Sequence, residues 1–410
     1  MVVPLEAYAS YVPRHLVERF QDDPSPPNEP REESCTAVLL FADIAGFTNL
    51  TEKLAREDSK GTEKLTGILN RFFGQLIAVV EGFGGDVLKF AGDALLAVWP
   101  VATDDQFASV ASRAVQCGLQ AQLQLTPFEA EGQSLAMRIS VHGGPVRLLE
   151  LGGGLGRWEL LLLGDPLQTL CGAELEANTG CVAVSGTVWE SLQGQFSGEV
   201  RDNGSVVLKT AKTLESIAEP SEVRTVPSME RALRAFIPGA VVTRLASGLT
   251  DWLAELRWIS AMFIQLPMLD SHVPLERAQA VLVELQRVIY HFEGSVNKLC
   301  IDDKGVTLVA AFGLPPLSHE DDPRRAVQTA MAIREFLDYP GSGIGIATGR
   351  VFCGSVGAQS RREYTIIGDA VNLAARLMQQ ADTGNRILCD EATWQTCHSC
   401  LCLGRRFHSS

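Results

Sequence analysis

Apolar runs and amphipathic segments alternate along the chain, which predicts a mixture of strands and helices. Residues 36–42 form an apolar run with the β-branching of a core strand. From Leu50 to Val80, apolar positions recur largely at helical spacing, which predicts a helix over about 49–81. The rest of this half predicts a hairpin over 86–99, a helix over about 104–122, and strands over 136–142 and 158–163. Hairpins joined by crossover helices favour an α+β sandwich of the ferredoxin-like βαββαβ kind.

The second half of the chain repeats the first. Lys89 in "GGDVLKFAGDALLAVWP" matches Lys298 in "EGSVNKLCIDDKGVTLVAAFGLP", 209 positions later. Two further pairs follow in the same order, "RAVQCGL" with "RAVQTAM" at an offset of 212 and "LLLLGD" with "YTIIGD" at an offset of 204. A nearly constant offset predicts a duplicated domain, each copy spanning about 180 residues.

Polar and proline-containing segments suggest where the domains begin and end. Residues 21–33 are Pro-rich and acidic, which is typical of a domain boundary or a loose arm, and residues 213–231 have the polarity of a linker. We therefore expect an arm over 1–34, a first domain over 35–210, a linker over 211–250, a second domain over 251–395 and an atypical tail over 396–410.

Composition narrows the class of protein. The 410 residues are 46% hydrophobic and 20% charged, as in soluble globular proteins, and a net charge of −14 argues against nucleic acid or an acidic membrane surface as a partner. No apolar run approaches the roughly 20 residues of a membrane span, and the N-terminus lacks the pattern of a signal peptide. The ten cysteines are scattered, which favours reduced thiols and a cytoplasmic location. Cys397, His398, Cys400 and Cys402 cluster, but no second ligand pair follows at zinc-finger spacing.

Two aspartates in the first half occupy positions suited to metal binding. Asp43 ends the strand in "FADIAGFT", and Asp93 follows Gly92 in a predicted hairpin turn. Carboxylates from two neighbouring strands are ligands that Mg²⁺ prefers. The turn after Asp43 leads into a helix, where backbone N–H groups of Ile44, Ala45, Gly46, Phe47 and Thr48 can cradle a polyphosphate. The alternative is a helix N-cap and an ordinary hairpin turn.

The second half supplies different side chains. In "EYTIIGDAVNLAARLM" a strand runs through a turn into a helix, and Asn372 and Arg376 share one helical face because they are four residues apart. An amide and a guanidinium facing one cleft suit the stabilisation of charge on a transferring phosphoryl group. The alternative is a solvated helix face.

Taken together, "FADIAGFT", "GGDVLKFAGDALLAVW", "IGIATGRVFCGSVG" and "EYTIIGDAVNLAAR" resemble the motifs of class III nucleotidyl cyclases. The similarity is strongest to the tandem catalytic domains of the vertebrate soluble, bicarbonate-responsive adenylyl cyclases, and it covers roughly residues 35–395. It implies two catalytic domains that pair within one chain, and formation of cyclic AMP from ATP with two Mg²⁺ or Mn²⁺ ions.

The resemblance assigns roles to residues at matching positions. Asp43, Asp93 and the Ile44 carbonyl would bind metal, while Asn372 and Arg376 would stabilise the transition state. The matching adenine-reading positions are Lys298 and Thr365, and a lysine donates to adenine N1, where guanine presents a donor. The resemblance therefore favours ATP over GTP. Arg138 matches a residue that touches the triphosphate, with an exposed strand arginine as the alternative.

The two clefts of such a pair are expected to be unequal. The second half has Gln265 and Leu266 where the first has Asp43 and Ile44, and the first half has Gln168 and Gly172 where the second has Asn372 and Arg376. One complete site results.

In the resembled enzymes the degenerate cleft binds bicarbonate through a lysine and an arginine. Lys89 matches the lysine, but Cys171 stands at the arginine position. A neutral thiol lacks the bidentate anion contact of an arginine, so we expect weak or absent bicarbonate stimulation.

The tail adds a second candidate function. Residues 396–410 lack the strand pattern that follows "RILCDEATW" in the family, so the second domain is expected to be truncated. This favours, as the alternative to an adenylyl cyclase, a catalytically impaired module that binds nucleotide or regulates a partner. A guanylyl cyclase is disfavoured by Lys298 and Thr365.

Overall fold

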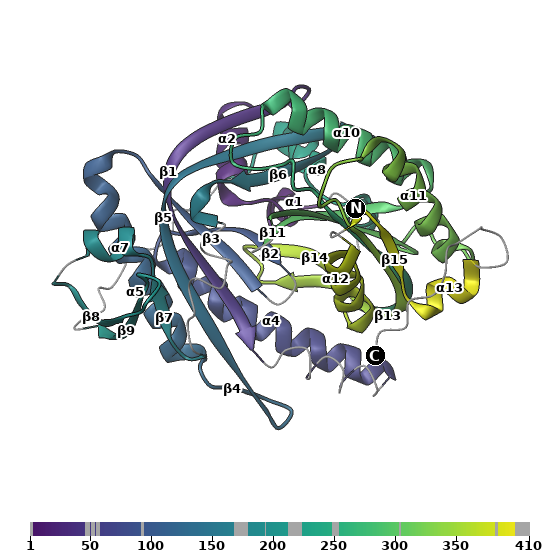
Figure 1. Ribbon diagram of the computed structural model, residues 1–410. Coiled ribbons are helices and arrows are strands. Elements are labelled where there is room, and N and C mark those ends of the chain that lie inside the picture. Colours follow the sequence, from purple (N-terminus) through teal and green to yellow (C-terminus); the bar gives the residue numbers. More distant parts are fainter. Residues whose placement is uncertain are drawn as a thin grey trace.

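The computed structural model describes most of the chain: residues 3–45, 58–91, 94–167, 179–192, 194–211, 224–247, 254–302, 305–381 and 384–397, with Leu50 and Leu54. Its strands form two sheets, each covered by helices on one face (Figure 1). This arrangement confirms the predicted α+β fold class. Asp93, Cys171 and the cysteine-rich tail beyond Cys397 lie outside the described residues.

The first sheet follows the predicted βαββαβ order. It is formed around β1 (Arg31–Ala45), β2 (Asp86–Ala91), β3 (Ala94–Val101) and β5 (Gln133–Gly154), with α4 (Asp58–Gly82) and α5 (Phe107–Leu125) as crossover helices. The strand order is β2-β3-β1-β5-β7-β9-β8, with β4 and β6 also paired to β5. The remaining elements are η1 (Asp104–Gln106), β4 (Phe128–Ala130), β6 (Arg157–Leu163), β7 (Val182–Val184), α7 (Gly186–Ser191), β8 (Phe196–Val200) and β9 (Val206–Ala211).

The second sheet repeats this topology. Its strands are ordered β11-β12-β10-β13-β14, and β15 also pairs with β13. The elements are β10 (Glu255–Gln265), α10 (Leu275–His291), β11 (Ser295–Asp302), β12 (Gly305–Phe312), α11 (Asp322–Phe336), β13 (Ile344–Gly357), β14 (Arg362–Ile367), α12 (Asp369–Ala381), β15 (Ile387–Cys389) and α13 (Glu391–Cys397).

The strand registers of the two halves correspond residue by residue around the matched lysines. Lys89 pairs with Leu96 and Lys298 pairs with Val309, and each lysine follows a β-bulge in its strand. A bulge is a specific local feature, so its recurrence at the same place agrees with a duplicated domain.

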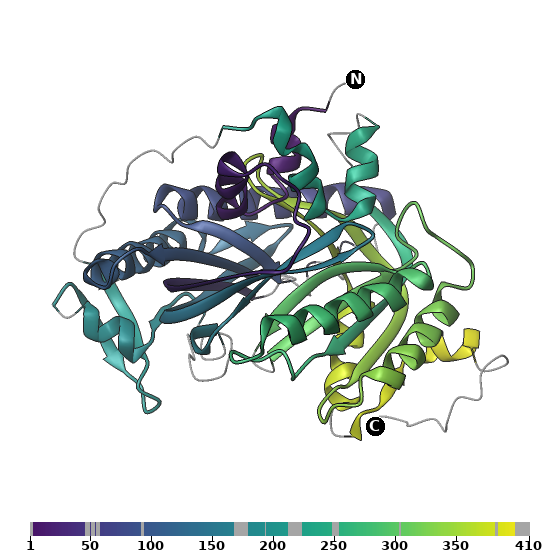
Figure 2. The same ribbon diagram turned by 90° about the horizontal axis from the view of Figure 1, so that it is seen from above.

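Each half contributes side chains to the helix-covered core of the other. Phe352 and Val356 of β13 belong to the cluster formed by α4 and the first sheet. Conversely, Leu149 of β5 and Leu161 of β6 belong to the cluster around α10 and the second sheet. The two halves therefore share apolar cores in a reciprocal way, and Figure 2 shows them side by side.

Two helical segments differ from the sequence expectation. The predicted arm contains α1 (Leu5–Ala9) and α2 (Arg14–Asp22), and the predicted linker contains η2 (Pro227–Met229), α8 (Glu230–Ala235) and α9 (Gly239–Ala246). These elements pack together in one buried cluster with residues of both sheets. Helices of five to nine residues carry too few apolar positions for a periodic pattern to stand out.

The predicted strand 136–142 is longer in the structure, where β5 runs from Gln133 to Gly154. The sequence "GGP" follows the predicted strand at 143–145, and pairing with β1 continues through it. A Cβ at Gly143 would lie 2.6 Å from the Phe107 ring, so this glycine permits close packing instead of ending the strand.

Among the described residues, no helix is long and apolar enough to cross a membrane.

Candidate active site

Asp43 lies near the end of the central strand β1. It pairs with Ala94 of β3 on one side and with Arg138 of β5 on the other. The Arg138 guanidinium donates to the Asp43 carboxylate and forms an ion pair with it. The Asp43 side chain is 24% exposed and that of Arg138 is 54% exposed, so both are accessible from solvent.

The sequence analysis predicts that a divalent cation binds beside Asp43. Ala94, opposite Asp43, is the residue that follows Asp93 in the chain. A carboxylate together with the Ile44 carbonyl would supply oxygen ligands of the kind that Mg²⁺ and Mn²⁺ bind. Within the described ranges no group of three His, Cys, Asp or Glu residues assembles a metal site. Gly46, Phe47 and Thr48 lie outside those ranges, and Ala45 is the last residue of β1.

Asn372 and Arg376 lie on α12, which begins directly after β14. Gly368 forms the turn with φ of 155°, and its carbonyl accepts the Asn372 backbone N–H. Ala374 and Met378 are buried on the opposite face of the helix, where they anchor it to the second sheet. Neither the Asn372 nor the Arg376 side chain has a hydrogen bond to any other described residue, and Arg376 is exposed.

The two predicted base-reading residues are neighbours. Lys298 is on β11, Thr365 is on β14, and the Lys298 ammonium donates to the Thr365 hydroxyl at 3.2 Å. The same ammonium donates to the Phe90 carbonyl of β2 at 3.0 Å, so it touches the first half of the chain. Lys298 is only 5% exposed.

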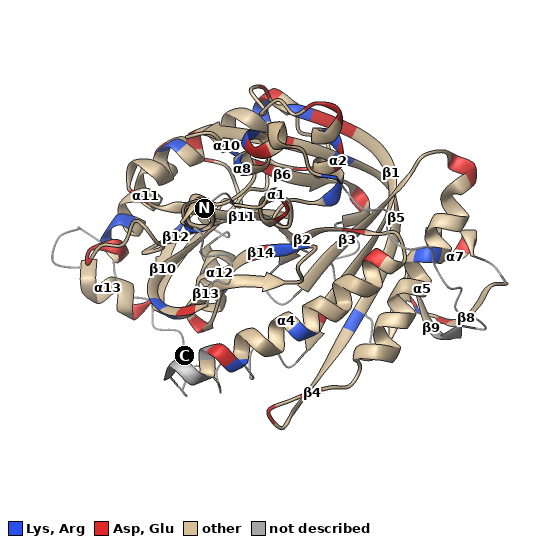
Figure 3. Ribbon diagram, turned by 180° about the vertical axis from the view of Figure 1, so that it is seen from behind, with Lys and Arg blue, Asp and Glu red and all other residues tan. Residues whose placement is uncertain are grey.

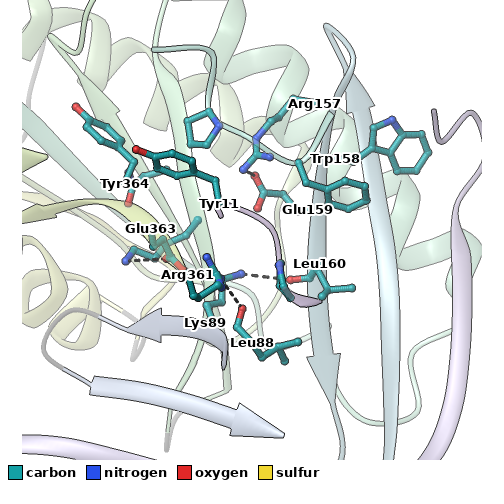
Figure 4. Close-up of a pocket in the computed structure, with 15 residues that line it drawn as sticks. Tyr11, Leu88, Lys89, Arg157, Trp158, Glu159, Leu160, Arg361, Glu363 and Tyr364 are labelled. Atoms are coloured by element: carbon teal, nitrogen blue, oxygen red, sulfur yellow. Dashed lines mark hydrogen bonds and ion pairs between the residues drawn. The ribbon is translucent and has the colours of Figure 1, made fainter. Parts of the chain in front are cut away.

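Two charged residues that the sequence analysis did not single out complete this junction. Glu363 accepts from the Phe90 N–H at 3.1 Å and lies 3.4 Å from the Lys298 ammonium. Arg361 donates to the Val87 and Leu88 carbonyls at 2.8 and 3.0 Å. Arg361 lies 3.5 Å from Glu363; Figure 4 shows both side chains, and Figure 3 shows where β14 and β2 lie.

A signal for Glu363 was present in the sequence. It precedes Thr365 by two residues on a strand, so the two side chains share a face. Burial lowers the pKa of the Arg361 guanidinium, and Glu363 opposes that shift.

In the second half, the positions that correspond to Asp43 and Asp93 carry no acidic side chain. Gln265 pairs with Thr307, as Asp43 pairs with Ala94, and its amide oxygen accepts from the Thr307 hydroxyl at 3.3 Å. Leu96 and Val309 are counterparts, because each pairs with the matched lysine of its own half. The residue three positions before Leu96 is Asp93, and the residue three positions before Val309 is the buried Val306. By strand register, Gln265 and Val306 therefore stand where the first half has Asp43 and Asp93.

Lys89 lines a small cavity between the halves. The cavity has a volume of about 60 Å³, and Lys89 donates to the Leu160 carbonyl at 3.3 Å (Figure 4). Arg157 and Glu159 also line it and form an ion pair at 2.8 Å. Gln168, Cys171 and Gly172, predicted in this degenerate region, lie outside the described residues.

Comparison with known proteins gives consistent matches over nearly the whole chain. The adenylate and guanylate cyclase catalytic domain family matches residues 29–227 and 259–404. The chain is 29% identical over 406 residues to adenylate cyclase type 10 of Oryctolagus cuniculus and of Homo sapiens, covering 90% of this chain and 25% of each relative. The chain therefore spans about a quarter of the length of these curated relatives.

Among solved structures, a class III adenylyl cyclase-like ATP-binding protein from Pseudomonas aeruginosa superposes with a TM-score of 0.62. The match covers 96% of this chain and 93% of that one at 14% identity. At this identity the match indicates the shared fold.

Proposed function

Because the chain belongs to the adenylate and guanylate cyclase catalytic domain family, we propose that it is an adenylyl cyclase, which converts ATP to 3′,5′-cyclic AMP and pyrophosphate. The observation that carries the proposal is the contact of Lys298 with both Thr365 and Phe90. It brings a donor suited to adenine N1 against the strand that leads toward Asp93. Base recognition and phosphate chemistry would then share one cleft between the halves.

Each residue of the cleft has a chemical task in this proposal. The 3′ hydroxyl of the ribose gives up its proton to solvent, its oxygen attacks the α-phosphorus, the bond to pyrophosphate breaks, and charge develops on the phosphate oxygens. Arg376 and Asn372 would stabilise that charge, and Arg138 would bind the triphosphate after leaving Asp43. Backbone N–H groups over residues 44–48 would hold the phosphates.

Asp43, Asp93 and the Ile44 carbonyl would hold two Mg²⁺ or Mn²⁺ ions. When bound, these ions supply Lewis-acid activation of the attacking oxygen and neutralise charge on the triphosphate. Positioning by the protein groups does the rest, and no covalent enzyme intermediate is needed.

Only one of the two clefts would be active. Gln265 and Val306 replace the carboxylates in the other cleft, so it would serve a structural or regulatory purpose. Because Cys171 stands at the anion-binding arginine position, we propose weak or absent stimulation by bicarbonate. A cytoplasmic role in cyclic AMP signalling completes the proposal.

A direct assay tests the activity. The purified chain is incubated with Mn²⁺ and either ATP or GTP, and the cyclic products are measured. We expect cyclic AMP from ATP, little cyclic GMP, and a fall of at least about a hundredfold in Asp43→Ala, since a metal-binding carboxylate is lost. Asp202→Ala, an exposed turn residue, serves as the matched control and should retain full activity.

The Asp43–Arg138 ion pair favours a second candidate, a nucleotide-binding module without turnover. A carboxylate engaged by arginine must release it before it can coordinate a cation. Binding of ATP with no cyclic product in the same assay would establish this alternative, and cyclic GMP as the main product would make the chain a guanylyl cyclase.

A further inference from the structure

The edge strand β2 of the first sheet is covered by side chains of the second half. Strand β2 is the terminal strand of its sheet, so its outward backbone groups have no partner strand. Arg361 donates to the Val87 and Leu88 carbonyls, Glu363 accepts from the Phe90 N–H, and Lys298 donates to the Phe90 carbonyl. Three charged side chains therefore satisfy four backbone groups of one strand.

Lys298 uses all three of its N–H donors in this arrangement. They are directed to the Phe90 carbonyl at 3.0 Å, the Thr365 hydroxyl at 3.2 Å and the Glu363 carboxylate at 3.4 Å. An ammonium has three donors and no acceptor, so an additional acceptor on a base must replace one of these contacts. The contact with Glu363 is the longest of the three.

We propose that Glu363 is a positioning residue that holds Lys298 in place for recognition of the adenine base, and so sets the preference for ATP over GTP. This inference rests on the proposed function, because it gives Lys298 the role of base reader. Lys298 would turn one N–H from Glu363 to adenine N1 while it keeps its contacts with Phe90 and Thr365.

Glu363 is itself fixed while Lys298 turns. Its second oxygen stays on the Phe90 N–H at 3.1 Å and faces the Arg361 guanidinium at 3.5 Å. Its side chain is 16% exposed, against 6% for those of Lys298 and Arg361. Without this carboxylate, two buried cations would face each other with no anion between them, and Lys298 would be driven from its position.

The substitution Glu363→Gln nearly preserves size, but it removes the charge and replaces one of the two acceptor oxygens with an NH₂ donor. We expect it to raise the dissociation constant and KM for ATP about tenfold, with kcat and the constants for GTP changed less than about threefold. The ratio of ATP to GTP preference should therefore fall about tenfold. Glu150→Gln is the matched control, since Glu150 is also buried and ion-paired, with Arg19 at 2.7 Å.

A double-mutant cycle separates positioning from a general structural effect. ATP and GTP binding in Mn²⁺ is measured by calorimetry, with initial rates in parallel, for the wild type, Glu363→Gln, Lys298→Met and the double variant. If Glu363 acts through Lys298, Glu363→Gln should cause no further loss of selectivity once Lys298 is Met. Should Glu363→Gln not fold, Glu363→Asp takes its place in the cycle, with a smaller change expected in the same direction.

The outcomes distinguish the two proposals. Equal losses of ATP and GTP binding in Glu363→Gln, or additive effects in the cycle, overturn the positioning role and leave the cyclase proposal untouched. Selective ATP binding that follows the cycle without any cyclic product supports the positioning role and refutes the cyclase activity. If the wild-type chain binds neither nucleotide, both proposals fail.

Discussion

Glu159 is a charged residue in the interior between the two halves, and its environment predicts a pH dependence of stability. Its side chain is 4% exposed and forms an ion pair with Arg157. Burial raises the pKa of this carboxyl above its ordinary value of 4.5, while Arg157 and Lys89 oppose the shift. The folded state therefore holds the proton more tightly than the unfolded state, so this group contributes most to the free energy of unfolding below pH 4.5 and less as the pH rises through the raised pKa.

Glu159→Gln tests this sign. The glutamine does not titrate, so the free energy of unfolding of the wild type minus that of the variant should decrease as the pH rises from about 4.5 to 8. Urea unfolding curves at several pH values measure the difference. A difference that is constant, or that grows with pH, would contradict the assignment.

At the residue scale, the sequence predicted which side chains recognise the base, but it did not predict which residues contact them. Lys298 and Thr365 were predicted because they match the adenine-reading positions of the resembled family, and the structure brings them within 3.2 Å of each other. Arg361 was missed because its partners are backbone carbonyls of β2, about 270 positions earlier in the chain. Any residue type can supply a backbone group to a hydrogen bond, so the sequence does not identify the partner.

At the scale of elements, helix α10 holds the turn between β5 and β6 through two glutamines. Gln286 is fully buried, accepts from the Gly154 N–H at 2.9 Å and donates to the Arg157 carbonyl at 3.1 Å. Gln279 accepts from and donates to Gly152 in the same way, at 2.8 Å each. These bonds join the second half to a glycine-rich turn of the first.

Gln286→Leu should destabilise the protein by about 2–4 kcal/mol, because it leaves two buried backbone groups without partners. Denaturant unfolding measures the change. The exposed Gln395→Leu on α13 is the control and should change stability by less than about 0.5 kcal/mol. An equally small effect of Gln286→Leu would show that water or a rearranged turn replaces these bonds.

The periodicity of apolar positions predicted the types and the order of the elements, but it did not predict the lengths of the strands or the presence of the short helices. The helix expected over about 104–122 is α5, Phe107–Leu125, and the expected hairpin is β2 and β3. Strand β5 extends past Gly143 because its neighbours, and not its local sequence, determine where pairing stops. Helices α8 and α9 depend on tertiary burial, which a polar segment does not reveal.

At the scale of the whole molecule, unequal clefts are a prediction from the sequence comparison of the halves. Gln265 was identified from alignment with Asp43, but the loss of the second carboxylate at Val306 required the strand register. The hairpin of the second half is longer, with 11 positions from Lys298 to Val309 against 7 from Lys89 to Leu96. Counting forward along the sequence from the two lysines therefore gives the wrong counterpart of Asp93.

Arg361 provides the most direct test of how the halves are held together. It is buried, donates to two carbonyls of β2 and lies beside Glu363, so Arg361→Met leaves both carbonyls without their donor and removes one of the two cations beside this carboxylate. We expect a loss of about 3–5 kcal/mol in the free energy of unfolding, as for a broken buried ion pair. Arg287→Met, at an exposed pair with Glu284, should change it by less than about 1 kcal/mol.

Hydrogen exchange distinguishes loosened docking from general destabilisation in the Arg361→Met variant. The amide of Phe90 is bonded to Glu363 across the junction, whereas the amides of β1 are bonded within the first sheet. If the edge of β2 is held by the second half, exchange at Phe90 should accelerate more than exchange in the β1–β5 ladder, and cyclic AMP formation should fall with it. The same acceleration in both places would mean that Arg361 stabilises the fold as a unit, and unchanged exchange at Phe90 would mean that β2 keeps its place without the second half.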